Sequence, residues 1–164
     1  MKQVHMLDAQ EAIKSILDNL DGHVSLGRKL GSIADKLAPE IKGYEKAREA
    51  LNKKYGEPRI IVRSPQEIPS FTLATQHKEG DPYVYAITDA DWEKIKENPG
   101  ITRDEQEAYM IPRANLSVYN EALDELMTTE LEFTDHIPES MFEGITMPKL
   151  GKYVAMLHDI VVEG

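Results

Sequence analysis

Histidine is the residue type in this chain best suited to metal binding or acid–base catalysis, and its five copies are spread over the whole length. They are His5, His23, His77, His136 and His158. No two of them show the His-x-x-x-His or His-Glu-x-x-His spacing that places two ligands on one helix face. A catalytic metal needs about three protein ligands that meet in space, and no local segment supplies them. We therefore predict no metal site and no dependence of stability on divalent metals.

Two of the histidines stand next to an aspartate, in the pairs Asp135-His136 and His158-Asp159. Neighbouring side chains on a strand point to opposite faces, so such a pair does not converge on one substrate atom. We expect surface or helix-capping positions for both pairs and predict no catalytic histidine.

Paired carboxylates are the next candidates for acid–base chemistry, and they occur as Asp91 with Glu93 and as Asp104 with Glu105. Both pairs fall where we expect a short helix to begin, and the helix dipole favours acidic side chains at that end. Cysteine is absent, which excludes disulfides, thiolate metal sites and cysteine catalysis. The sequence predicts no catalytic residue.

Residues 27–32, Gly-Arg-Lys-Leu-Gly-Ser, superficially suggest a phosphate-binding loop. The Walker pattern needs four residues between its glycines and a lysine directly before Ser or Thr, after a strand. Three residues separate Gly27 from Gly31, and no lysine precedes Ser32. We predict no bound cofactor, and an enzyme of the hydrolase or nucleotide-handling class is the least favoured function.

Three aromatic residues, Tyr83, Tyr85 and Trp92, lie close together in the middle of the chain. They are open to two interpretations: a small core beneath a β-hairpin, or a surface patch that contacts another protein. Tyr and Trp are enriched at protein–protein hot spots, because they offer a large contact area at little cost in entropy. We take these three residues as the candidate protein contact.

One long helix dominates the secondary structure that the sequence predicts. Apolar residues recur at steps of three and four from Ser25 to Tyr55, which is typical of a helix with one apolar stripe. Pro39 interrupts this segment, and we expect a kink near it. Such a stripe must be buried against a partner helix, which indicates packing and protein contact rather than chemistry.

The remaining segments alternate between helical and strand patterns. Asp8 with Glu11 predicts the capped start of a first helix, and Gly22 its end. The other expected helices cover residues 90–98, 102–109, 115–128 and the segment from 146, and the expected strands cover residues 59–63, 71–75, 83–87 and 131–137.

These elements predict an α+β protein: a helical hairpin with a small antiparallel β insertion and a C-terminal strand and helix. The chain of 164 residues is expected to form a single domain, residues 1–164. Residues 1–57 and 114–164 make the helical body in this interpretation, and residues 58–113 make the β-containing insertion.

The hairpin itself is expected to pair residues 40–55 with residues 115–128 in antiparallel fashion. Both segments carry an apolar stripe, and the chain between them begins and ends on one side. We therefore expect Leu51 and Leu123 to be buried at their contact.

The net charge limits the classes of partner that the protein can bind. The chain carries a net charge of −10, and residues 114–164 hold ten acidic residues against two lysines. Such a surface repels phosphates, which disfavours direct nucleic-acid binding. No apolar run is long enough to cross a membrane, and the first residues lack the pattern of a secretory signal. We expect a cytoplasmic protein whose partner is another protein or a second copy of itself.

Residues 26–30 and 44–57, which end in a Tyr-Glu-x-x-Arg…Lys-Tyr-Gly-Glu pattern, resemble a family of small tailed-bacteriophage proteins of unknown function. The resemblance continues through residues 120–127, 130–133 and 137–140. This chain departs from the family in its middle part, which is longer and richer in β patterns. The resemblance implies phage origin and protein contact, with no catalytic residue to transfer.

From these observations we expect a non-enzymatic phage protein that acts by protein–protein contacts, as a virion assembly or structural component. It would lie in the host cytoplasm or in the virion. The alternative is a small acidic inhibitor of a host defence system or host enzyme.

Overall fold

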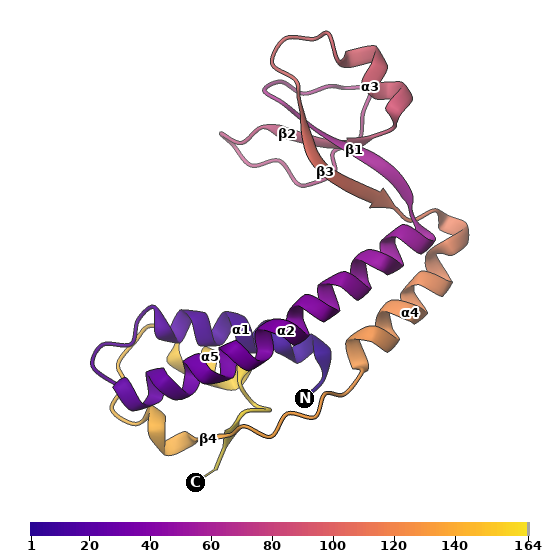
Figure 1. Ribbon diagram of the computed structural model, residues 1–164. Helices are drawn as coiled ribbons and strands as arrows, with labels where there is room; N and C mark the ends of the chain where they lie inside the picture. Colours follow the sequence, from indigo (N-terminus) through magenta and orange to yellow (C-terminus); the bar gives the residue numbers. More distant parts are fainter. Residues whose placement is uncertain (164) are drawn as a thin grey trace. The chain divides into compact units, whose positions relative to one another are not determined.

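The computed structural model describes residues 1–163 and has an α+β fold (Figure 1). The α-helices are α1 (Gln3–Leu17), α2 (Val24–Tyr55), α3 (Asp89–Ile95), α4 (Leu116–Thr128) and α5 (Leu150–Met156). Two 3₁₀ turns accompany them, η1 (Arg113–Asn115) and η2 (Glu139–Phe142). The strands are β1 (Glu57–Ser64), β2 (Tyr83–Ile87), β3 (Thr102–Met110), β4 (Ile137–Pro138) and β5 (Val161–Val162).

The chain divides into two compact units. The first contains residues 1–49 and the chain from Glu121 onward, and the second contains residues 50–120. The long helix α2 begins in the first unit and ends in the second. The second unit covers the β insertion expected at residues 58–113 together with the helix ends that flank it.

The first unit is built around the N-terminal helical hairpin of α1 and α2, whose turn contains Gly22 with a φ of 79°. The apolar stripe of α2 is buried from Leu26 to Tyr44, as the periodicity predicts. It joins one core with the buried face of α1 and with Leu157 and Ile160 near the C-terminus.

The start of α1 differs from the expectation. The helix begins at Gln3, five residues before the expected cap at Asp8, and Lys2 provides no side-chain cap. The first N–H of the helix, that of Gln3, is instead bound by a distant segment and donates to the carbonyl of Thr129 at 3.1 Å. Lys2 also forms an isolated bridge with Glu130. A distant segment therefore supplies the cap that the local sequence lacks.

Near the C-terminus the expected strand at residues 131–137 is wrong over most of its length. Only Ile137 and Pro138 are in a strand, β4, which pairs in parallel with β5. Leu131 and Phe133 pack against the first core without a strand partner. The expected last helix is present as α5.

The second unit holds a three-stranded antiparallel sheet in the order β2-β1-β3. Its small core contains Ile60, Val62, Tyr85, Ile87 and Ile95. The expected strand at residues 71–75 is reduced to one bridge, between Leu73 and Tyr85. The sequence also suggests a hairpin of residues 71–75 with residues 83–87, but the main partner of β2 is β1, and residues 71–75 contribute only this bridge.

Residues 102–109 are the clearest error. The charged run Thr-Arg-Asp-Glu-Gln-Glu-Ala favours a helix, yet it forms β3, paired with β1 from Thr102 to Met110. Tertiary pairing overrides local propensity here, because β1 pairs with both ends of β3, at residues 102–103 and 107–110. The register shifts between Ile60 and Val62, which marks a bulge.

The predicted burial of Leu51 and Leu123 is also wrong, since both are only half-buried and α4 has no buried residue. Within the second unit, the end of α2 holds the start of α4 by polar bonds. Asn115 Nδ2 donates to the carbonyl of Tyr55 at 2.9 Å, and the Tyr119 hydroxyl donates to Asn52 Oδ1 at 2.8 Å. In the described part of the chain, no helix has the length and hydropathy of a membrane span.

Candidate functional site

β3 is an edge strand of the sheet in the second unit. β1 is the central strand and β3 pairs only with it, so no described strand covers the other side of β3. We call this side, from Thr102 to Met110, the β3 edge. Most residues of the strand are exposed, and its charged side chains are Arg103, Asp104, Glu105 and Glu107. A long exposed edge is a template for pairing with another chain, and charges restrict which chain can pair.

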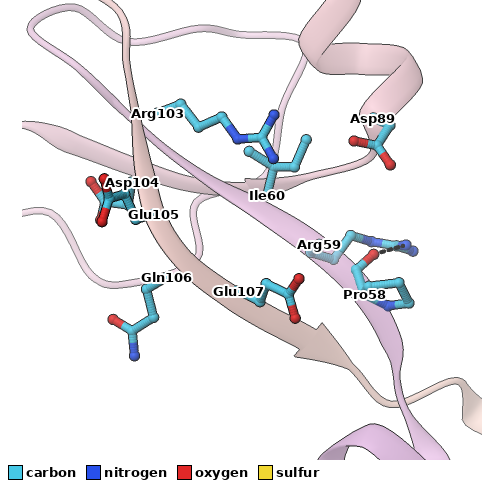
Figure 2. Close-up of a pocket in the computed structure, with 9 residues that line it drawn as sticks. All are labelled: Pro58, Arg59, Ile60, Asp89, Arg103, Asp104, Glu105, Gln106 and Glu107. Atoms are coloured by element: carbon cyan, nitrogen blue, oxygen red, sulfur yellow. Dashed lines mark hydrogen bonds between the residues drawn. The ribbon is translucent and has the colours of Figure 1, made fainter.

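A small polar hollow of about 110 Å³ lies over β1, β3 and the start of α3 (Figure 2). Arg103 extends across Ile60 toward the side on which Asp89 lies. The lining is completed by Pro58, Arg59, Asp104, Glu105, Gln106 and Glu107. The lining thus mixes both signs of charge and contains no Ser, Thr, Lys or His.

The two arginines that line the hollow differ in the hydrogen bonds and ion pairs of their side chains. Arg59 is largely buried and fixed, because its Nη2 lies 3.1 Å from Glu57 Oε2 and its Nη1 donates to the carbonyl of Pro58 at 3.2 Å. The side chain of Arg103 has no hydrogen-bond or ion-pair partner among the described residues. Next to the β3 edge, Arg103 and the carboxylate of Glu105 are therefore available to a partner.

The three aromatic residues expected at a protein contact all pack against the small second core, but their exposure differs. Tyr85 is fully buried, and its hydroxyl accepts a hydrogen bond from the N–H of Ile68 at 2.8 Å. Tyr83 is half-buried and stacks on His77 at 3.9 Å. Trp92 is half-buried on α3. Tyr85 can therefore offer no surface to a partner, and the aromatic contact rests on Tyr83 and Trp92.

The remaining sequence candidates fall in ordinary structure. Residues 27–32 lie inside α2 rather than in a loop. Asp91 belongs to the N-terminal cap of α3: its N–H donates to Thr88 Oγ1 at 3.1 Å, and Thr88 Oγ1 donates back to Asp91 Oδ2 at 2.9 Å. Asp104 lies on β3, where its carboxylate accepts from Arg63 Nε, rather than at a helix start.

A second cluster, which sequence reasoning missed, lies in the first unit. His5 on α1 meets His158 and Asp159, which follow α5, and ligand atoms of the three side chains lie within 4.8 Å of one another. His5 Nδ1 donates to Asp159 Oδ2 at 2.7 Å. No local spacing could reveal this cluster, because His5 and Asp159 are 154 positions apart.

The electrostatic environment of Asp159 favours its charged form. Partial burial raises the pKa of this carboxyl. The hydrogen bond from His5 and the positive charges of His158, His5 and the N-terminus outweigh that effect, so the pKa lies below its ordinary value. The carboxylate is therefore ionised at neutral pH, as a metal ligand or an ion-pair partner must be.

Comparison with known proteins gives no relative. No protein-family model, curated protein or solved structure matches the chain significantly. The resemblance to tailed-bacteriophage proteins remains a prediction from the sequence, and functional inference rests on the sites themselves.

Proposed function

We propose that this protein acts by binding another protein, and that the β3 edge takes up an extended, basic segment of that partner. Following the resemblance drawn from the sequence, we assign it to a tailed bacteriophage. There it would serve as a virion assembly or structural component, in the host cytoplasm or in the virion.

The observation that supports the proposal most directly is the unpaired side of β3. The strand is nine residues long and pairs with β1 at residues 102–103 and 107–110, with a bulge at residues 104–106 between them. Its other side has no described strand partner. An added strand would satisfy the free backbone groups, which supplies affinity, while side chains supply specificity. The side chain of Arg103 beside the edge has no described partner, so a single acidic residue within the basic segment would gain an ion pair there.

Charge determines which strand can be added. The side chains of β3 comprise one arginine and three acidic residues, Asp104, Glu105 and Glu107. A second copy of β3 would bring like charges together, and this opposes pairing between copies. A partner segment rich in Lys and Arg would gain favourable contacts. The net charge of −10 would also speed the approach of a basic partner.

Site-specific photo-cross-linking tests the proposal. A photoreactive residue at Gln106, exposed on β3, should cross-link one discrete partner in infected cells. The same residue at Lys46, exposed on α2, should not. Cross-linking from Lys46 alone would contradict binding at the β3 edge.

A charge reversal then tests the chemistry of the contact. Glu105→Lys should weaken binding to the captured partner several-fold and reduce its salt dependence. Glu97→Lys makes the same change at an exposed position after α3 and should leave affinity unchanged. If both variants weaken binding equally, the partner is attracted by the overall charge of the protein and not by a contact at the β3 edge.

The alternative function, a small acidic inhibitor of a host defence system or host enzyme, is favoured by the concentration of charge. Residues 114–164 carry ten acidic residues against two lysines, and such a surface can compete for a basic binding site. The position of the gene in the phage genome distinguishes the assembly role from the inhibitor role. Neighbouring head and tail genes support assembly, and an early accessory block supports inhibition.

A further inference from the structure

We propose that His5, His158 and Asp159 form a binding site for one divalent transition-metal ion, with zinc as the best match. The site lies in the first unit and is independent of the β3 edge, so it goes beyond the proposed function. It also reverses the expectation of no metal drawn from the spacing of histidines.

The donor set suits zinc. Two imidazole nitrogens and one carboxylate oxygen are a common set of three protein ligands, with a fourth position left for water or a partner's side chain. Hard cations such as Mg²⁺ and Ca²⁺ prefer oxygen ligands alone. The side chains are accessible to an incoming ion, since His5 and Asp159 are each 29% exposed and His158 is 52% exposed.

The distances between the donors are close to those that a metal requires. Tetrahedral ligands at the usual zinc bond lengths are separated by roughly 3.3 Å. Asp159 lies 2.7 Å from His5 Nδ1 through Oδ2 and 3.7 Å from His158 Nε2 through Oδ1. Small side-chain rotations would bring all three to bonding distance. His5 Nδ1 would release its proton to solvent as the ion binds, because a metal-bound nitrogen is unprotonated.

The backbone around the donors is firmly held. His158 and Asp159 lie in a turn between Leu157 and Ile160, two fully buried residues, and the N–H of Ile160 donates to the carbonyl of Leu157 at 2.7 Å. His5 directly precedes Met6, which is also fully buried. A rigid frame of this kind presents ligands in a fixed geometry and lowers the entropy cost of binding.

The competing explanation is a His5–Asp159 ion pair that ties α1 to the C-terminal segment. That pair does not need His158, whose ring lies 4.5 Å from the ring of His5 in an edge-to-face arrangement. The ion pair makes no use of the His158 ring, whereas a metal ion would bind one of its nitrogens as a third ligand. His158 therefore distinguishes the two explanations.

Calorimetric titration of the untagged full-length chain with zinc chloride tests the site. We expect one ion per chain, with binding lost or weakened more than tenfold in His158→Ala. This variant leaves the His5–Asp159 hydrogen bond in place, so the helical circular-dichroism signal should persist. His136→Ala removes an exposed histidine of the same unit and should bind zinc as the parent does.

A second measurement does not depend on any variant. Cobalt should replace zinc and produce the visible absorption bands of a four-coordinate ion, and excess zinc should remove them. Absence of saturable zinc binding by the parent chain would overturn the proposal. So would zinc binding by His158→Ala with undiminished affinity, which would leave the ion pair as the only role of the cluster.

Discussion

Gly56 connects α2 to β1 with no intervening loop, because α2 ends at Tyr55 and β1 begins at Glu57. A Cβ atom at this position would lie 2.6 Å from the carbonyl oxygen of Asn52 and 2.9 Å from Cβ of Tyr109. Both contacts are too short for real atoms, and one of them involves backbone. The junction therefore depends on a residue without a side chain.

We predict that Gly56→Ala lowers the free energy of unfolding by about 1–3 kcal/mol, the usual cost of overpacking. Urea unfolding followed by circular dichroism measures it. The control is Gly43→Ala inside α2, where a Cβ meets no atom within 4 Å. That variant should gain stability by roughly 0.5–1 kcal/mol, because alanine favours the helix. Unchanged stability of Gly56→Ala would mean that the junction opens without cost.

Tyr85 carries a second prediction at this scale. Tyr85→Phe leaves the N–H of Ile68 without its acceptor inside the unit, which should cost about 1–3 kcal/mol. Tyr83→Phe is the matched control, since the structure shows no hydrogen bond of the Tyr83 hydroxyl among the described residues. Fluorescence of the single tryptophan, Trp92, reports unfolding of this unit. If both variants are equally stable, the buried hydroxyl is not structurally important.

Among the elements, α2 is buried unevenly along its length. Leu30 is fully buried in the stripe, whereas Leu51 near the other end of the helix is half-buried. We predict that Leu30→Ala destabilises the protein by about 2–5 kcal/mol and Leu51→Ala by clearly less, because less apolar surface is lost. Denaturant midpoints of the two variants decide the order. An equal or reversed order would place Leu51 in an additional contact, such as one between copies.

The cap of α3 predicts a dependence on pH. Hydrogen bonds from Lys94 and Thr88 lower the pKa of Asp91 below its ordinary value of 3.8. Because the pKa of Asp91 is lower in the folded state, its ionised carboxylate stabilises the fold at pH values above the ordinary pKa. This stabilisation is lost as the pH falls through the folded-state pKa. Stability around α3 should therefore decrease in acid.

Asp91→Asn should remove this part of the acid dependence, as followed by Trp92 fluorescence in urea at a series of pH values. Asp89→Asn, two residues earlier and with no described hydrogen bond of its side chain, should retain it. An unchanged acid profile in Asp91→Asn would assign the dependence to other carboxylates.

Elements whose signals are local were predictable. The apolar stripe of α2, the strand at β1 and the short helix α3 follow from patterns that are near in sequence. The start of α1 was not predictable, because its first N–H binds the carbonyl of Thr129, which is far away in sequence. β3 was not predictable either, because its residues favour a helix locally and form a strand only through pairing with β1.

On the scale of the whole molecule, the same distinction applies to the candidate sites. Glu105 and Trp92 drew attention in the sequence as residue types, but the β3 edge could not be foreseen while residues 102–109 were expected to be helical. The metal cluster requires His5 to meet Asp159 across almost the whole chain. Residue patterns within a short stretch of sequence cannot predict a contact between residues so far apart in the chain.

The presence of two separate cores gives a prediction for unfolding of the whole chain. Most helical residues lie in the first unit, and Trp92, the single tryptophan, lies in the second. Leu30→Ala should shift the circular-dichroism transition in urea and leave the Trp92 fluorescence transition near its parent midpoint. A common shift of both transitions would show that the chain unfolds as one cooperative unit.

The glycine junction between α2 and β1 also constrains how the length of this chain can vary in evolution. Residues 65–82, which connect β1 to β2, are mostly exposed and include no named helix or strand. Insertions and deletions should therefore accumulate there among relatives, as they do in surface loops generally. Between Asn52 and Arg59, by contrast, a single added residue would rotate the end of α2 against the first pairs of the sheet, so relatives should keep that spacing unchanged.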